Sequence, residues 1–70
     1  MNTFKTTRNC AGSFTVTFTR DGEFVDQAWV ERCEDDERRW TTSVTDATFE
    51  TKREAAAMAR EVMTESANWN

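Results

Sequence analysis

A strictly alternating segment followed at once by an Asp-Gly dipeptide constrains the fold of this chain more than any other feature of its sequence. Over 13–20, apolar side chains alternate with polar ones, which is the period of a half-buried β-strand. Asp21-Gly22 suits a two-residue type I′ turn, because both turn positions need a positive φ. A hairpin with a second strand over 23–33 follows. Its register places three pairs of residues opposite one another: Phe18 with Val25, Val16 with Gln27, and Phe14 with Trp29.

A second reversal is expected at the acidic segment 34–37, and it leads to a third strand over 38–47. A loop of two or of four residues gives the same register. In that register Trp40 and Val44 lie on the face that the first hairpin already makes apolar. Agreement between two separately placed turns supports the assignment.

The start of a helix is marked by Thr51-Lys52-Arg53-Glu54, which matches a capping box. The alanine-rich segment that follows predicts a helix over 52–67, and its apolar stripe continues to Trp69. The predicted fold is α+β, a three-stranded antiparallel β-meander with one C-terminal helix packed on one face, in a single domain over 1–70. Residues 1–9 lie outside this pattern and are expected to be flexible. The predicted core consists of Phe14, Phe18, Val25, Trp29, Trp40, Val44, Met58 and Val62.

The composition argues against most kinds of catalytic site. The chain has no histidine, no proline and only two glycines, which removes histidine-based triads, histidine-ligated metals and glycine-rich phosphate loops. We therefore expect no enzyme activity, no cofactor and no metal. No apolar run approaches the roughly 20 residues of a membrane span, and the first residues lack a signal-peptide core. A cytoplasmic protein that does not enter the membrane is expected.

The two cysteines, Cys10 and Cys33, would lie opposite each other if the first hairpin extended that far. A disulfide there would add about 3 kcal/mol of stability, but the pair would occupy a hydrogen-bonded position, where bridging is strained. In the cytoplasm the expected state is two reduced thiols. The bridged state stays open as the alternative.

Most of the negative charge lies in one stretch. The net charge is −4, yet residues 21–37 alone hold eight acidic residues and one arginine, which gives −7. Such a stretch is either a solvated turn or a negative patch that imitates nucleic-acid phosphates and binds a basic partner surface. The candidate partner-binding residues are Asp26, Glu31, Glu34, Asp35, Asp36 and Glu37.

One face of the predicted sheet has no helix to cover it. It is either plain solvent-exposed sheet or a binding surface, and the unprotected edge strands also permit a homodimer. The tryptophans are expected to be core residues, with Trp69 as the candidate interface anchor. The predicted open face carries Thr15, Thr17, Thr19, Phe24, Asp26, Ala28, Val30, Arg32, Arg39, Thr41, Ser43 and Thr45.

The segment Thr-Phe-Glu-Thr-Lys-Arg-Glu-Ala over 48–55, after a strand with Trp40, resembles the strand-to-helix junction of the Arm-type DNA-binding domain of phage tyrosine integrases. The resemblance covers about the last half of the chain. It implies three strands and a helix that read the DNA major groove with the sheet face. The cations of such a nucleic-acid-binding module would be Arg32, Arg38, Arg39, Lys52 and Arg53.

In size, acidic charge and strand-plus-helix build, the chain also resembles small phage-encoded inhibitors, including some anti-CRISPR proteins. This resemblance implies a non-catalytic interaction protein that binds a basic, nucleic-acid-binding surface of a host defence protein in the host cell cytoplasm. Direct nucleic-acid binding is not expected, because the overall negative charge opposes it. The inhibitor is therefore the function expected from the sequence, and the Arm-type module is the alternative.

Overall fold

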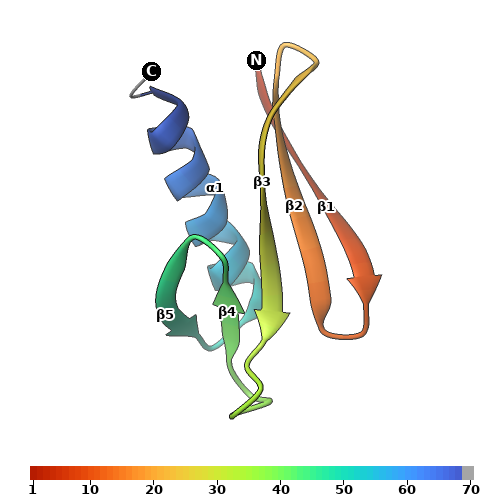
Figure 1. Ribbon diagram of the computed structural model, residues 1–70, viewed down its shortest axis with the longest axis vertical. Coiled ribbons are helices and arrows are strands. Elements are labelled where there is room, and N and C mark those ends of the chain that lie inside the picture. The colour runs from red at the N-terminus through yellow and green to blue at the C-terminus, as the bar shows by residue number, and fades with distance from the viewer. Residues whose placement is uncertain (69–70) are drawn as a thin grey trace.

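The computed structural model describes residues 1–68 and has the expected α+β build, an antiparallel sheet with one C-terminal helix. The sheet has five strands rather than the three predicted, and each strand pairs with its neighbours along the chain. Figure 1 shows the helix beside β3 and β4, with β1 at the far edge of the sheet. The elements are β1 (Asn2–Cys10), β2 (Ser13–Arg20), β3 (Glu23–Arg32), β4 (Trp40–Thr42), β5 (Thr45–Phe49) and α1 (Lys52–Asn68).

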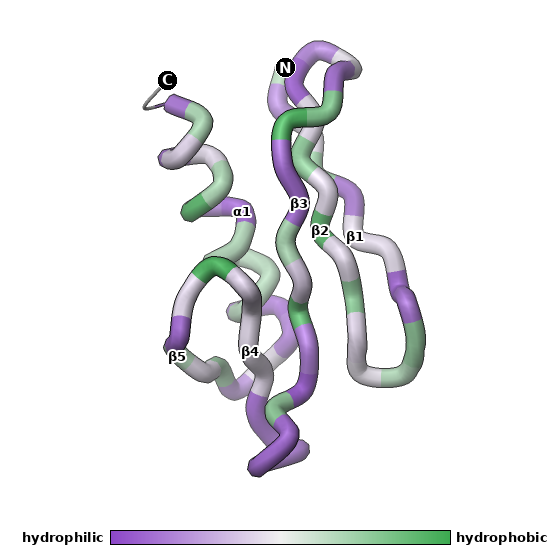
Figure 2. The backbone as a smooth tube through the Cα atoms, viewed as in Figure 1, coloured by the Kyte–Doolittle hydropathy of each residue, from purple (hydrophilic) through white to green (hydrophobic). Residues whose placement is uncertain are grey.

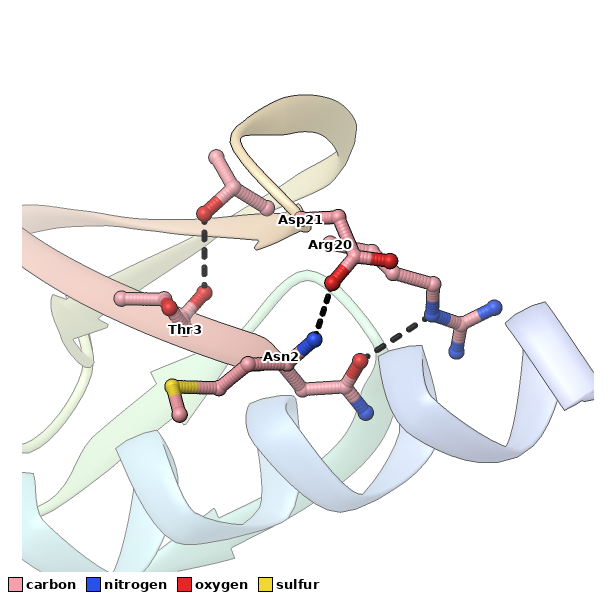
Figure 3. Close-up of polar contacts among 6 residues, drawn as sticks. Asn2, Thr3, Arg20 and Asp21 are labelled. Carbon is pink, nitrogen blue, oxygen red and sulfur yellow. Dashed lines mark hydrogen bonds and ion pairs between the residues drawn. The ribbon is translucent and has the colours of Figure 1, made fainter.

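The expectation of a flexible segment over 1–9 is wrong, because these residues form β1 and pair with β2. The Phe4 ring stacks on the Phe18 ring with centroids 4.7 Å apart. At the start of the strand, Arg20 Nε donates to Asn2 Oδ1 at 3.0 Å (Figure 3). Phe4 is the one large apolar residue of β1. The residue pattern of β1 alone is therefore too weak to predict a strand. Its contacts with β2 stabilise it.

The turn between β2 and β3 forms as predicted. Asp21 and Gly22 both have positive φ, at 53° and 84°, as a two-residue type I′ turn requires. The Asp21 carboxylate accepts a hydrogen bond from the Met1 nitrogen (Figure 3). The Asp21 N–H also donates to the Met1 C=O at 3.0 Å. The turn is thereby joined to the start of β1.

A β-bulge lies just after this turn. Thr19 pairs with Phe24, whereas Phe18 pairs with Asp26, so Val25 is an extra residue on β3. Side chains alternate between the two faces of a strand, so one extra residue moves every later side chain of β3 to the opposite face. The predicted register is therefore correct only at the turn itself.

The bulge decides which residues of β3 reach the core. Ala28 and Val30, predicted on the open face, are 0% exposed. Val25 and Trp29, predicted in the core, are 37% and 45% exposed, so that part of the prediction is wrong. The buried core consists of Val16, Phe18, Ala28, Val30, Ala55, Ala56, Ala59 and Met63, against which Phe14, Trp40 and Val44 pack partly buried.

The predicted third strand over 38–47 is in fact two strands, β4 and β5, separated by a reversal that begins at Ser43. Thr42 pairs with Val30. The loop of two or four residues expected from the sequence would instead place Thr42 opposite Trp29, so the observed register differs by one residue. The Trp29 N–H donates to Ser43 Oγ and the Ser43 N–H donates to the Trp29 C=O, both at 3.0 Å. These bonds hold the reversal against β3.

The helix α1 begins at the predicted capping box. The Glu54 N–H donates to Thr51 Oγ1 at 3.1 Å, and the Thr51 hydroxyl lies 3.3 Å from the Glu54 carboxylate. The buried alanines of α1 allow the helix to lie close to the sheet. Trp69, expected at the end of the apolar stripe and as an interface anchor, lies outside the described residues. Across 1–68, no helix combines the length and the apolar character needed to cross a membrane.

Candidate functional site

The loop between β3 and β4, residues 33–39, contains four acidic residues and is called the acidic loop below. Its two ends are joined by a hydrogen bond from the Cys33 N–H to the Arg39 C=O at 3.0 Å. Asp36 Oδ1 accepts the Arg38 N–H, and the Asp36 C=O accepts the Arg39 N–H, both at 3.0 Å. An aspartate that binds the backbone two residues later is a typical turn former. The acidic loop is therefore held in shape by its own hydrogen bonds.

Three of the four carboxylates of the acidic loop are free to meet a partner. Glu34, Asp35 and Glu37 are exposed, whereas Asp36 is half-buried. Within residues 1–68, the one ion pair of the loop joins Asp36 to Arg38 at 3.5 Å. Figure 2 shows the loop as a strongly hydrophilic segment at the end of the molecule away from the N-terminus. The loop presents three unpaired negative charges there.

The structure separates the other two candidate residues from the acidic loop. Glu31 lies on the sheet face turned away from α1, beside Trp29 and Ser43, in a hollow of about 200 Å³. Asp26 lies at the bulge, about 20 Å along the strand from the end of β3, and its Oδ1 accepts the Gln27 N–H at 2.8 Å. The six predicted residues are therefore not one site.

The cations of the alternative hypothesis are spread over several elements. Arg39 Nε and Nη2 donate to the hydroxyl and the C=O of Thr48 at 2.8 and 3.1 Å, which ties the acidic loop to β5. Arg38 is paired with Asp36, and Arg53 is exposed on the first turn of α1. The remaining two cations, Arg32 and Lys52, lie over aromatic rings. These five cations do not form a single row on the sheet.

An open pocket of about 770 Å³ lies where the β1–β2 turn, the acidic loop and the start of α1 meet. The Cζ atom of Arg32 lies 5.2 Å from the ring centroid of Trp40, and Lys52 Nζ lies 4.2 Å from that of Phe14. The ring centroids of Phe14 and Trp40 are 6.1 Å apart. The pocket was not predicted from the sequence, because the residue pattern does not indicate β1. The available signal was the glycine at Gly12, a turn residue between two segments of mostly polar character.

Both cysteines are free thiols in the structure. Cys10 pairs with Ser13 across the β1–β2 turn, so the extended hairpin that would place it opposite Cys33 does not form. Cys10 is exposed and Cys33 is half-buried. Within residues 1–68, no three His, Cys, Asp or Glu side chains are grouped so that they could hold a metal ion.

The sheet face turned away from α1 carries the β2 threonines predicted for it, but the β3 residues on it differ from those predicted. Because of the bulge, Trp29 and Glu31 lie on it in place of Ala28 and Val30. Near the turn, Phe24 is 63% exposed. This face is a polar surface with exposed aromatic side chains.

Comparison with known proteins finds no matching family model, and no match among the curated proteins or the solved structures.

Proposed function

We propose that the chain is a non-catalytic interaction protein that binds a basic, nucleic-acid-binding surface of another protein through its acidic loop. The observation that carries this proposal is the group of three exposed carboxylates of Glu34, Asp35 and Glu37, which have no cation partner among residues 1–68. Like charges held close together repel one another, and a positively charged partner surface relieves that repulsion.

The spacing of these charges supports an imitation of nucleic acid. Residues 34–37 hold a carboxylate at every position over at most about 11 Å of backbone, and each strand of double-stranded DNA carries a negative charge about every 3.4 Å along the axis. A nucleic-acid-binding surface has lysines and arginines arranged for a dense row of this kind. Asp36 contributes by keeping the loop in one shape, which lowers the cost of ordering it on binding.

The finer form of the proposal is an inhibitor encoded by a phage or another mobile element. The small size, the net charge of −4 and the sheet-plus-helix build are similar to those of small phage-encoded inhibitors, including some anti-CRISPR proteins. Such a protein acts in the host cell cytoplasm by occupying the nucleic-acid site of a defence protein. It needs no catalysis, because blocking the site is sufficient.

Affinity capture from a nuclease-treated host lysate tests this proposal. The immobilised wild-type chain should retain a basic protein, and added duplex DNA should release it because both ligands compete for one surface. A loop variant should lose this protein, and a control variant of equal net charge should keep it. The loop variant carries Glu34→Gln, Asp35→Asn and Glu37→Gln, and the control carries Asp46→Asn, Glu61→Gln and Glu65→Gln, at three exposed acids outside the loop.

Two results would contradict the proposal. If the loop variant and the control retain the same proteins, the acidic loop is not the binding element. If a parallel capture without nuclease retains proteins that are all absent after nuclease treatment, and the wild-type chain shifts random duplex DNA in a gel at physiological salt, the Arm-type nucleic-acid-binding module takes the place of the inhibitor.

A further inference from the structure

The open pocket of about 770 Å³ is built from segments that lie far apart in the sequence. Arg8 comes from β1, Arg32 is the last residue of β3, and Lys52 is the first residue of α1, so three cations line it. Figure 1 shows the end of β1, the end of β3 and the start of α1 toward the same end of the molecule. The volume lies in the range of pockets that hold small organic ligands, roughly 300–1,000 Å³.

Two of these cations are positioned by the rings beneath them. The Arg32 guanidinium lies over Trp40, and the stem of Arg32 runs past Gly12, where a Cβ atom would come within 3.3 Å of Arg32 Cδ. The Lys52 ammonium lies over Phe14. Cation–π attraction and packing of the stems favour these arrangements. A ligand that binds the two cations therefore meets groups that are already placed.

The charge of the pocket favours an anion of low charge. In the described part of the chain, none of its three cations has a carboxylate within ion-pair distance. Glu34 and Glu37 also line the pocket, so its lining has a formal charge of +1. The first turn of α1 adds the partial positive charge of a helix N-terminus. A ligand with many negative charges would be repelled by the two glutamates.

We propose that this pocket binds a small phosphate monoester of the nucleoside monophosphate class. Arginine guanidinium groups donate paired hydrogen bonds to phosphate oxygens, and the Lys52 ammonium supplies a further charge. Phe14 and Trp40 also line the pocket, so the part of each ring that its cation leaves uncovered offers apolar surface to a base. The carboxylates of Glu34 and Glu37 are acceptors for the amino group of a base. The negative charge of Glu34 and Glu37 also favours a nucleoside monophosphate over a nucleoside triphosphate.

A titration of the isotope-labelled protein followed by nuclear magnetic resonance tests this inference, with the amides of Gly12 and Cys33 as reporters of the pocket. The probes are AMP, ATP, inorganic phosphate and adenosine. AMP should give saturable shifts at these amides. The other three probes should each bind more weakly, because ATP adds repelled charge, phosphate lacks the base, and adenosine lacks the phosphate.

Two charge-removing variants on the same strand separate a site from general ionic attraction. Arg8→Gln should weaken AMP binding about tenfold, the usual size of a lost charge-assisted hydrogen bond. Lys5→Gln is the control, because Lys5 is exposed on the other face of β1, and it should leave AMP affinity unchanged. Both positions are exposed, so both variants should fold. Equal weakening by the two variants, or no shift with AMP at millimolar concentration, would overturn the inference.

This inference is independent of the proposed function and fails separately from it. The loop variant replaces Glu34 and Glu37 of the pocket lining with glutamines, whose amide oxygens still accept hydrogen bonds from a base but carry no charge. It should therefore bind AMP more tightly than the wild type even though it loses its protein partner. Weaker AMP binding by the loop variant would contradict the charge argument. Loss of the protein partner with no AMP binding at all would reject the pocket and leave the proposed function standing.

Discussion

Ala28→Asp should unfold the chain, whereas Gln27→Asp, one residue earlier on β3, should leave the fold intact. Ala28 is 0% exposed, pairs with Val16 and belongs to the same buried cluster as the alanines of α1. Gln27 is exposed on the other face of the sheet. A hairpin without the bulge at Val25 would exchange the two environments. The pair of variants therefore tests the bulge directly.

The magnitudes follow from burial. An unpartnered carboxylate in the core costs about 3–5 kcal/mol, and the single core of a chain this short rarely supplies more than about 3–5 kcal/mol in total. Ala28→Asp therefore removes most or all of the stability. The exposed change Gln27→Asp should alter it by no more than about 1 kcal/mol.

Urea denaturation followed by circular dichroism measures both variants, and its pH dependence adds a second signature. Burial would raise the pKa of the carboxyl introduced by Ala28→Asp above its unfolded value. This variant should therefore regain stability as the pH falls through that raised pKa, because the folded state binds the proton more tightly than the unfolded state does. A stable Ala28→Asp protein beside an unfolded Gln27→Asp protein would refute the reasoning.

Three further predictions concern the turns, the helix cap and the thiols. Thr51→Ala removes the acceptor for a first-turn amide of α1 and should lower the free energy of unfolding by about 1 kcal/mol in urea denaturation; no change would contradict the cap. Gly12→Ala should cost more stability than Gly22→Ala, because both glycines have positive φ but only at Gly12 does an added Cβ meet another side chain. Thiol titration should count two free thiols per chain, with exposed Cys10 reacting faster than half-buried Cys33; a count of none would show a disulfide.

The features that the sequence predicts correctly depend on neighbouring residues alone. The Asp21-Gly22 turn needs two positive φ angles, and the dipeptide supplies them whatever the rest of the chain does. The helix start depends on Thr51 and Glu54, which lie within one turn. Both were predicted at the correct residues for that reason.

Which face of β3 points toward the core could not be predicted in the same way, because both of its faces carry apolar residues. Val25 and Trp29 give one face, whereas Ala28 and Val30 give the other. The choice depends on the helix, whose buried alanines and Met63 pack against the sheet. A small residue such as Ala28 permits close packing there, and a tryptophan would not. Packing against α1, which lies far from β3 in the sequence, thus favours the bulged register.

The candidate site was predicted in part for a similar reason. The exposure of Glu34, Asp35 and Glu37 follows from their charge and their place in a loop. The distinct role of Asp36 depends on which backbone amides its carboxylate reaches, and spacing alone does not show this. The pocket depends on β1, which is stabilised by pairing with β2 and carries little pattern of its own.

The role of the acidic loop is tested most directly by the rate at which the chain associates with the purified protein that it captures. Charge complementarity accelerates association, and salt screens exposed charges over about 8 Å at physiological ionic strength. Association of the wild type and of the control variant should therefore slow markedly as salt is raised, whereas the loop variant should associate slowly at every salt concentration. Equal association rates and equal salt dependence for the loop variant and the wild type would contradict the proposed function.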